Sequence, residues 1–108
     1  MRINLAIVSL VALSLTGEAA AQQVHIAGVG MGSCGVWAEA RRLNKAEMLE
    51  QWVVGFLSGV AVGAAGKLDP LHGTDFQGVI SWIDNYCSVH PLKQVSDAAQ
   101  GLMVAHPR

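Results

Sequence analysis

The sequence predicts a small all-α domain of four helices, held by one disulfide and preceded by a cleaved signal peptide. Three observations lead to this prediction. After residue 34, apolar residues recur at the three- and four-residue spacings of amphipathic helices. The N-terminus is an apolar segment that ends in small residues, and two cysteines, Cys34 and Cys87, follow it.

The N-terminus has the pattern of a secretory signal peptide. Met1 and Arg2 precede an apolar segment, residues 3–15, which is followed by Ala19-Ala20-Ala21. The segment is shorter than the roughly 20 residues that cross a bilayer, so a retained membrane anchor is the less favoured alternative. We expect cleavage after Ala21, which removes residues 1–21, with cleavage after Ala19 as the alternative.

The mature chain, residues 22–108, has the size of one small domain. It carries six Lys/Arg and seven Asp/Glu residues, and this balance gives no electrostatic reason to expect binding to nucleic acid or to an anionic membrane. Its many apolar and few charged residues argue against a disordered chain. We therefore expect an exported globular domain with no membrane association after signal cleavage.

Cys34 and Cys87 are predicted to form a disulfide. An even number of cysteines in an oxidising compartment normally pairs, and with two cysteines no other pairing competes. Closing a loop of about 53 residues is worth roughly 4 kcal/mol in the chain-entropy description. A reactive thiol or redox pair is the less favoured alternative, because neither a C-x-x-C spacing nor a basic neighbourhood is present.

Residues 22–33 are predicted to form a flexible glycine-rich leader, because they contain three glycines and no charge. Gly30 to Gly35 also match the pattern G-x-G-x-x-G after a strand-like Val24-His25-Ile26. A dinucleotide site requires a returning parallel strand within a larger sheet, and nothing downstream has that pattern. We interpret the match as chance and expect no nucleotide cofactor.

The first helix is predicted from Cys34 to about Leu43. Asn44 and Glu47 resemble a capping box, so the second helix is predicted over residues 45–65. Its apolar stripe consists of Leu49, Trp52, Val53, Phe56, Leu57 and Val60.

Gly55, Gly59 and Gly63 recur at every fourth position of this second helix. Such a track lets another helix approach closely, and we expect that helix to belong to the same domain; a membrane-helix motif is the alternative. Each interior glycine costs roughly 0.5–1 kcal/mol relative to alanine, so the helix depends on its neighbours.

The third and fourth helices follow a turn-rich loop, residues 66–73. Thr74 and Gln77 form a T-x-x-Q capping box for the third helix, and Pro91 ends it or opens the next. The apolar positions of the third helix place Cys87 on the buried face of that helix. The last helix is predicted to run to about Ala105, so the disulfide-bonded helical domain covers residues 34–105. Its apolar positions are Val95, Ala98, Ala99 and Leu102.

No constellation of residues indicates an enzyme. The four histidines lie far apart in the sequence and form no metal-ligand pattern, and no G-x-S-x-G motif is present. Asp69 and Asp75 flank the central loop, where carboxylates usually begin turns and helices. We expect no catalytic residue, no metal and no cofactor, and we expect Trp37, Trp52 and Trp82 to be core or interface residues.

Three segments resemble the HdeA/HdeB family of small periplasmic acid-stress chaperones. They are SCGVW at residues 33–37, LEQWVVGFLSGV at residues 49–60, and TDFQGVISWIDNYCSVHP at residues 74–91. The similarity covers about residues 33–100 and is one of spacing. His90 stands where the family usually has Asn, and the chain has fewer charges than those chaperones.

The resemblance implies a periplasmic protein that is an idle dimer at neutral pH and exposes apolar surface to unfolding client proteins in acid. The formal charge of residues 22–108 would change from −1 to +10 near pH 2, while the disulfide would prevent full unfolding. The client or partner surface would include Trp52, Val53, Phe56 and Leu57. The chain is also similar to Rap1a/Tai immunity proteins, which usually have more cysteines; this alternative implies binding and inhibition of a secreted cell-wall hydrolase.

Overall fold

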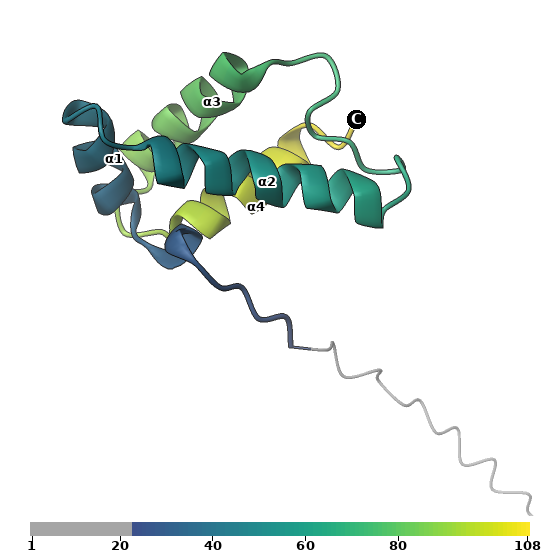
Figure 1. The fold of residues 1–108 in the computed structure, drawn as a ribbon, viewed down its shortest axis with the longest axis horizontal. Helices are drawn as coiled ribbons and strands as arrows, with labels where there is room; N and C mark the ends of the chain where they lie inside the picture. Colours follow the sequence, from purple (N-terminus) through teal and green to yellow (C-terminus); the bar gives the residue numbers. More distant parts are fainter. Residues whose placement is uncertain (1–22) are drawn as a thin grey trace, which may run out of the picture.

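The computed structural model describes residues 23–108, which form four α-helices after one short 3-10 helix (Figure 1). This confirms the predicted all-α fold, whereas the predicted signal peptide lies outside the described residues. Between residues 23 and 108, no helix is long and apolar enough to cross a membrane. The elements are η1 (Val29–Met31), α1 (Cys34–Arg42), α2 (Glu47–Gly63), α3 (Phe76–Val89) and α4 (Val95–Ala105).

The core lies between α2 and the pair α3 and α4. In Figure 1, α2 crosses the front of the domain, α4 lies behind it, and α1 closes one end. Positions three and four apart on each helix supply the buried side chains, as the apolar spacing predicts. The largest buried apolar residues are Trp37, Leu49, Val53, Leu57, Val79, Ile80, Ile83, Val95 and Leu102.

The predicted disulfide between Cys34 and Cys87 is present, and both residues are buried. Their Cα atoms are 4.8 Å apart, so the bond joins the first turn of α1 to the last turns of α3. Beside it, the Cys34 N–H donates to the Lys93 carbonyl at 2.7 Å, and the Val95 N–H donates to the Gly32 carbonyl at 2.9 Å. The beginning of α1 is therefore tied to both α3 and α4.

The predicted capping box at Asn44 is wrong. Asn44 has φ 53° and lies in the left-handed region that follows a helix C-terminus. The Lys45 N–H donates to the Ala40 carbonyl at 2.8 Å, which closes the end of α1. The N-cap of α2 is Ala46, whose side chain makes no cap hydrogen bond. Asparagine tolerates the left-handed region better than most residues, so here it ends one helix instead of beginning the next.

The third helix begins close to its predicted position, but the predicted capping box of Thr74 and Gln77 is wrong. The N-cap of α3 is Asp75, one residue later than predicted, and its carboxylate accepts from the Gly78 N–H at 2.8 Å. The final helix ends at Ala105, as predicted.

Part of the predicted leader packs on the domain. Gly30, in η1, is buried against the ring of Trp52, and a Cβ at this position would overlap that ring. The Trp52 indole N–H donates to the Ala27 carbonyl at 3.1 Å. Residues 28–33 are thus in contact with the helices, while the flexibility of the leader stays a prediction. Gly30, the first glycine of the G-x-G-x-x-G match, leaves room for the ring of Trp52.

The prediction that Gly55, Gly59 and Gly63 admit a helix of the same domain is wrong. All three are exposed, and a Cβ at any of them would meet no atom of the described chain within 4 Å. They lie on the side of α2 opposite Val53 and Leu57, which are fully buried. The larger side chains, which bury more apolar area, determine which side of the helix faces the core.

Two glycine substitutions are expected to change stability in opposite directions. Gly30→Ala lowers the free energy of unfolding by about 1–3 kcal/mol, because its Cβ overlaps Trp52. Gly59→Ala raises it by about 0.5–1 kcal/mol, because the methyl group enters open space and the helix loses a flexible residue. Urea unfolding of both variants in dilute solution measures the difference. Equal destabilisation by both would contradict this packing.

Candidate functional site

The four residues predicted to bind a client or partner lie in different environments. Val53 and Leu57 are fully buried, whereas Trp52 and Phe56 are half-buried on the flank of α2. Their two rings stack with centroids 5.2 Å apart. Adjacent residues of a helix point about 100° apart, so Val53 and Leu57 face the core while Trp52 and Phe56 lie at the edge of the same apolar stripe. The structure therefore divides this set into a core pair and an aromatic pair.

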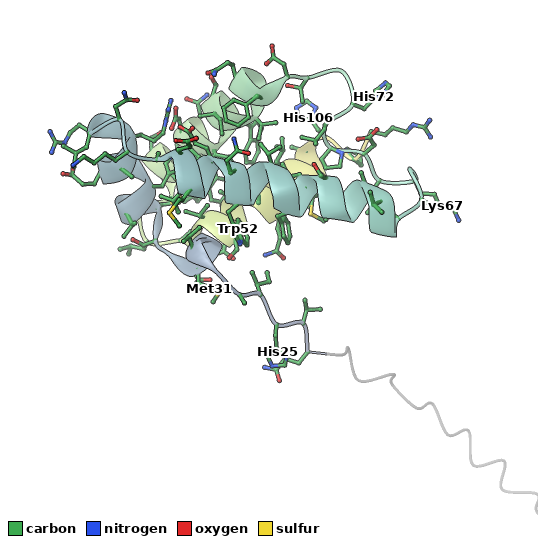
Figure 2. All side chains as sticks on the ribbon, viewed as in Figure 1. His25, Met31, Trp52, Lys67, His72 and His106 are labelled. Atoms are coloured by element: carbon green, nitrogen blue, oxygen red, sulfur yellow. A yellow bond between two sulfur atoms is a disulfide. The ribbon has the colours of Figure 1, made fainter. Side chains whose placement is uncertain are left out.

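Trp52 borders two apolar hollows, and Phe56 borders one of them. One has a volume of about 480 Å³ and lies between α2 and the extended N-terminal segment; its lining residues are Val24, His25, Ile26, Ala27, Trp52, Gly55 and Phe56. The other, of about 590 Å³, is lined by Val29, Glu47, Met48, Gln51 and Trp52. Figure 2 shows Trp52 where α2 meets the segment that contains Met31.

The exposed side of α2 forms a continuous face beside these hollows. Its residues recur at spacings of three and four, and none of them is charged. We call this set the outer face of α2: Met48, Gln51, Gly55, Gly59, Val62 and Gly63. Met48 and Val62 are 73% and 82% exposed. A large apolar residue exposed at each end of a glycine track makes this face a candidate for binding another protein.

A polar cluster joins three helices at the other side of α2. The Trp37 indole N–H donates to Oδ1 of Asp84 at 2.7 Å. The Arg41 guanidinium donates to both oxygens of the same carboxylate, at 3.0 Å from Nε and 2.9 Å from Nη2. Its Nη1 donates to Oε1 of Glu50 at 2.8 Å. We call these four residues the Arg41 cluster; they connect α1 with α3 and α2.

Arg41 keeps its charge in acid. The hydrogen bond to Asp84 is the largest cause that raises the pKa of Arg41 above its ordinary value; partial burial opposes it, and the hydrogen bond to Glu50 adds to it. A cation with a raised pKa contributes stability that is present below its ordinary pKa and is lost only as the pH rises through the raised value. The raised pKa of Arg41 therefore causes no loss of stability in acid.

A neighbouring ion pair offers a contrast. Arg42 donates to Glu39 within α1, both side chains are exposed, and the hydrogen bond from Arg42 lowers the pKa of Glu39. The stability from this lowered pKa is present above the ordinary value and is lost as the pH falls. Solvent screens an exposed pair strongly, so its contribution is small.

No catalytic arrangement is found among residues 23–108. They contain no group of three or more potential metal ligands and no free cysteine. His25 lies in the N-terminal segment, away from His72 and His106 at the opposite end of the domain (Figure 2). Asp75 caps α3. That the protein is not an enzyme stays a prediction.

The Arg41 cluster was not predicted from the sequence. The available signal was Trp37, because a buried indole N–H almost always has an acceptor. Periodicity places Trp37 and Arg41 on the same face of α1, four residues apart. It does not identify Asp84, which is 43 residues from Arg41 in the sequence.

Two substitutions of Asp84 separate its hydrogen bond from its charge. Asp84→Ala leaves the buried Trp37 N–H and Arg41 without their acceptor, so the free energy of unfolding falls by about 2–3 kcal/mol. Asp84→Asn keeps an oxygen that accepts from Trp37, so the loss is about 1 kcal/mol. Denaturant unfolding at pH 7 measures both. An equal loss in the two variants would show that the indole hydrogen bond contributes nothing.

Comparisons with known proteins give no match for this chain. No family model matches it, and no curated protein and no solved structure is significantly similar to it. The function must therefore be argued from the two features described above, the surfaces of α2 and the Arg41 cluster.

Proposed function

We propose that this protein is an exported, conditional chaperone that offers the inner side of α2 to unfolding clients in acid. One observation carries the proposal: the apolar side chains of α2 pack in a core whose polar contacts to α1 and α3 depend on two carboxylates, Glu50 and Asp84. The proposed location is the periplasm, an oxidising compartment in which a disulfide persists.

The acid step acts on the Arg41 cluster. Near pH 2 the carboxylates of the chain are formally neutral, so a partly buried cation such as Arg41 is left without charged acceptors. At the same time the formal charge of residues 22–108 changes from −1 to +10, which opposes a compact state. The junction of α1, α2 and α3 is where both effects act together.

The disulfide limits the opening. Cys34 and Cys87 keep α1 joined to α3, whereas α2 is connected to both through loops and non-covalent contacts. We therefore expect α2 to separate first, which exposes Val53 and Leu57 beside the half-exposed Trp52 and Phe56. An apolar helix face of this kind binds exposed apolar segments of other chains. Because the disulfide persists in acid, refolding after neutralisation begins from a constrained chain.

A second function is favoured by a different observation. The outer face of α2 and the hollows beside Trp52 are exposed in the folded domain, without any acid step. A surface of this kind suits a protein that binds one partner at neutral pH, as an immunity protein that inhibits a secreted cell-wall hydrolase would do. A tight 1:1 complex at pH 7, with no client protection at pH 2, would support this second function.

The chaperone function predicts a coupled response to acid. Binding of a hydrophobic dye should rise between about pH 4 and 2 with most helicity kept, and aggregation of an acid-unfolded client should be suppressed over the same range. Arg41→Gln should move the rise in dye binding to higher pH by roughly 0.5–1 unit, because the cluster starts weaker.

Arg42→Gln is the matched control, since it removes one arginine from the same helix and breaks only the exposed pair with Glu39. We expect its dye-binding profile to stay close to that of the unaltered protein. Client aggregation that is unchanged at equal mass would disprove the chaperone function. An equal shift in both arginine variants would show that net charge, and not the Arg41 cluster, sets the transition.

A further inference from the structure

A third hollow lies between the loop that joins α2 to α3, the first half of α3 and the end of α4. It has a volume of about 190 Å³ and shares no lining residue with the two hollows beside Trp52. Its buried lining residues are all apolar: Pro70, Val79 and Leu102. A cavity of about 150 Å³ is enough for a benzene molecule, so this hollow can take a ligand built on one six-membered ring.

Two histidines at the edge of this hollow have no hydrogen-bond partner for their rings in the described chain. His72 comes from the loop and His106 from the end of α4, and both are exposed. Among the histidine rings of residues 23–108, only that of His90 forms a hydrogen bond, with the Tyr86 carbonyl. An imidazole donates from one nitrogen when it is neutral and from both when it is protonated. The edge of the hollow therefore offers donors to which a ligand can supply the acceptor.

Backbone hydrogen bonds fix the loop and the C-terminal tail that carry these histidines. The Asp69 N–H donates to the Pro107 carbonyl at 2.7 Å, which joins the two segments directly. The His72 N–H donates to the Asp69 carbonyl at 3.0 Å, and the His106 N–H donates to the Leu102 carbonyl at 2.8 Å. Figure 2 shows both histidines at the same end of the domain. The two imidazoles are thus carried by segments that the fold has already joined.

Thr74 and Trp82 add two more donors to the lining. A Cβ at Gly78 would overlap the Thr74 hydroxyl, so glycine at this position leaves the hydroxyl its place beside the hollow. The indole N–H groups of Trp37 and Trp52 donate to acceptors of the chain. The indole N–H of Trp82 has no such partner within residues 23–108, and it is not buried. Every polar side chain in the lining can therefore donate, and no carboxylate is among them.

We propose that this hollow binds a small monocarboxylic acid whose hydrocarbon part has the size of one six-membered ring. The buried apolar residues contact the hydrocarbon part, and the carboxylate accepts hydrogen bonds from His72, Thr74 and His106. Hydrogen bonds to a charged acceptor are about twice as strong as those between neutral groups. A cation would find no carboxylate in the lining, and a phosphate or sulfate ion would leave the apolar floor in contact with water.

The charged residues near the hollow do not line it. Asp75 precedes α3, and its carboxylate accepts from the Gly78 N–H at 2.8 Å. Asp69 belongs to the loop, and Arg108 follows the tail. None of these three charged residues is part of the lining. Within residues 23–108, the two histidines are thus the titratable side chains that a carboxylate in the hollow meets.

The site is separate from both functions proposed above. No residue of α2 or of the Arg41 cluster lines it. A bound acid would hold the loop between α2 and α3 against α3 and α4, and would raise the stability of the folded domain. A binding test without a client or a protein partner addresses this site alone, so either proposal can fail while the other holds.

An NMR titration of the isotope-labelled, disulfide-bonded protein with benzoate tests the proposal. We choose about pH 6, near which histidines change charge. The indole N–H resonance of Trp82 should shift and saturate, with a dissociation constant on the order of 1 mM, because a ligand of this size makes few contacts. Benzamide has nearly the same shape without the charge and should bind about fivefold more weakly or worse.

Removing the donors tests the role of the two histidines. His72→Ala and His106→Ala should each raise the dissociation constant for benzoate by roughly fivefold, with an unchanged circular dichroism spectrum, because both side chains are exposed. His25→Ala is the matched control, since it removes an exposed histidine that lines a different hollow. Its dissociation constant should equal that of the unaltered protein.

Three results would overturn the proposal. The first is the absence of saturable shifts at the Trp82 indole up to about 20 mM benzoate, well above the expected dissociation constant. The second is equal affinity for benzoate and benzamide, which would show a hollow that does not recognise a carboxylate. The third is an equal loss in His25→Ala and in the two lining variants, which would place the binding elsewhere on the protein.

Discussion

The bond between Cys34 and Cys87 is the constraint on which the rest of the domain depends. It holds the first turn of α1 against the end of α3, and two adjacent backbone hydrogen bonds hold the same turn against the beginning of α4. This position inserts Trp37 into the core and directs its indole N–H to Asp84. Arg41 follows one helical turn later and reaches the same carboxylate. The polar cluster is thus a geometric consequence of where the disulfide fixes α1.

The longest helix is left with non-covalent support, and its two sides differ. The inner side contributes Val53 and Leu57 to the core, and the outer side exposes apolar residues around a glycine track. Neither side carries a charge along most of the helix, so removing the apolar surface of either side from water is favourable. The domain covers one side, and the other side is exposed within residues 23–108. Each interior glycine also weakens α2, so its attachment to the domain is sensitive to contacts at its ends.

The Arg41 cluster makes one of those ends dependent on charge. Arg41 and Asp84 are each about one-third exposed, while Glu50 is more buried. Solvent screens a partly exposed ion pair, so such a pair contributes less to stability than a fully desolvated one. Loss of the carboxylate charges would nevertheless leave Arg41 as a partly buried cation without a charged partner. In the proposed opening by acid, the ion pair between α1 and α2 breaks first, and the disulfide between α1 and α3 remains.

The positions of the helices and the disulfide could be predicted from the sequence, because both depend on local spacing and on a pairing without competitors. Capping was harder: Asn44 suits a helix start and a helix end equally well, and the contacts of Lys45 with Ala40 decided between them. Packing also decided that the glycines of α2 lie on its exposed side. A four-residue spacing places them on one face of the helix, but it does not determine whether that face is buried or exposed. The Arg41 cluster depended on tertiary structure most of all, because no local signal joins side chains that are 43 residues apart until the chain folds.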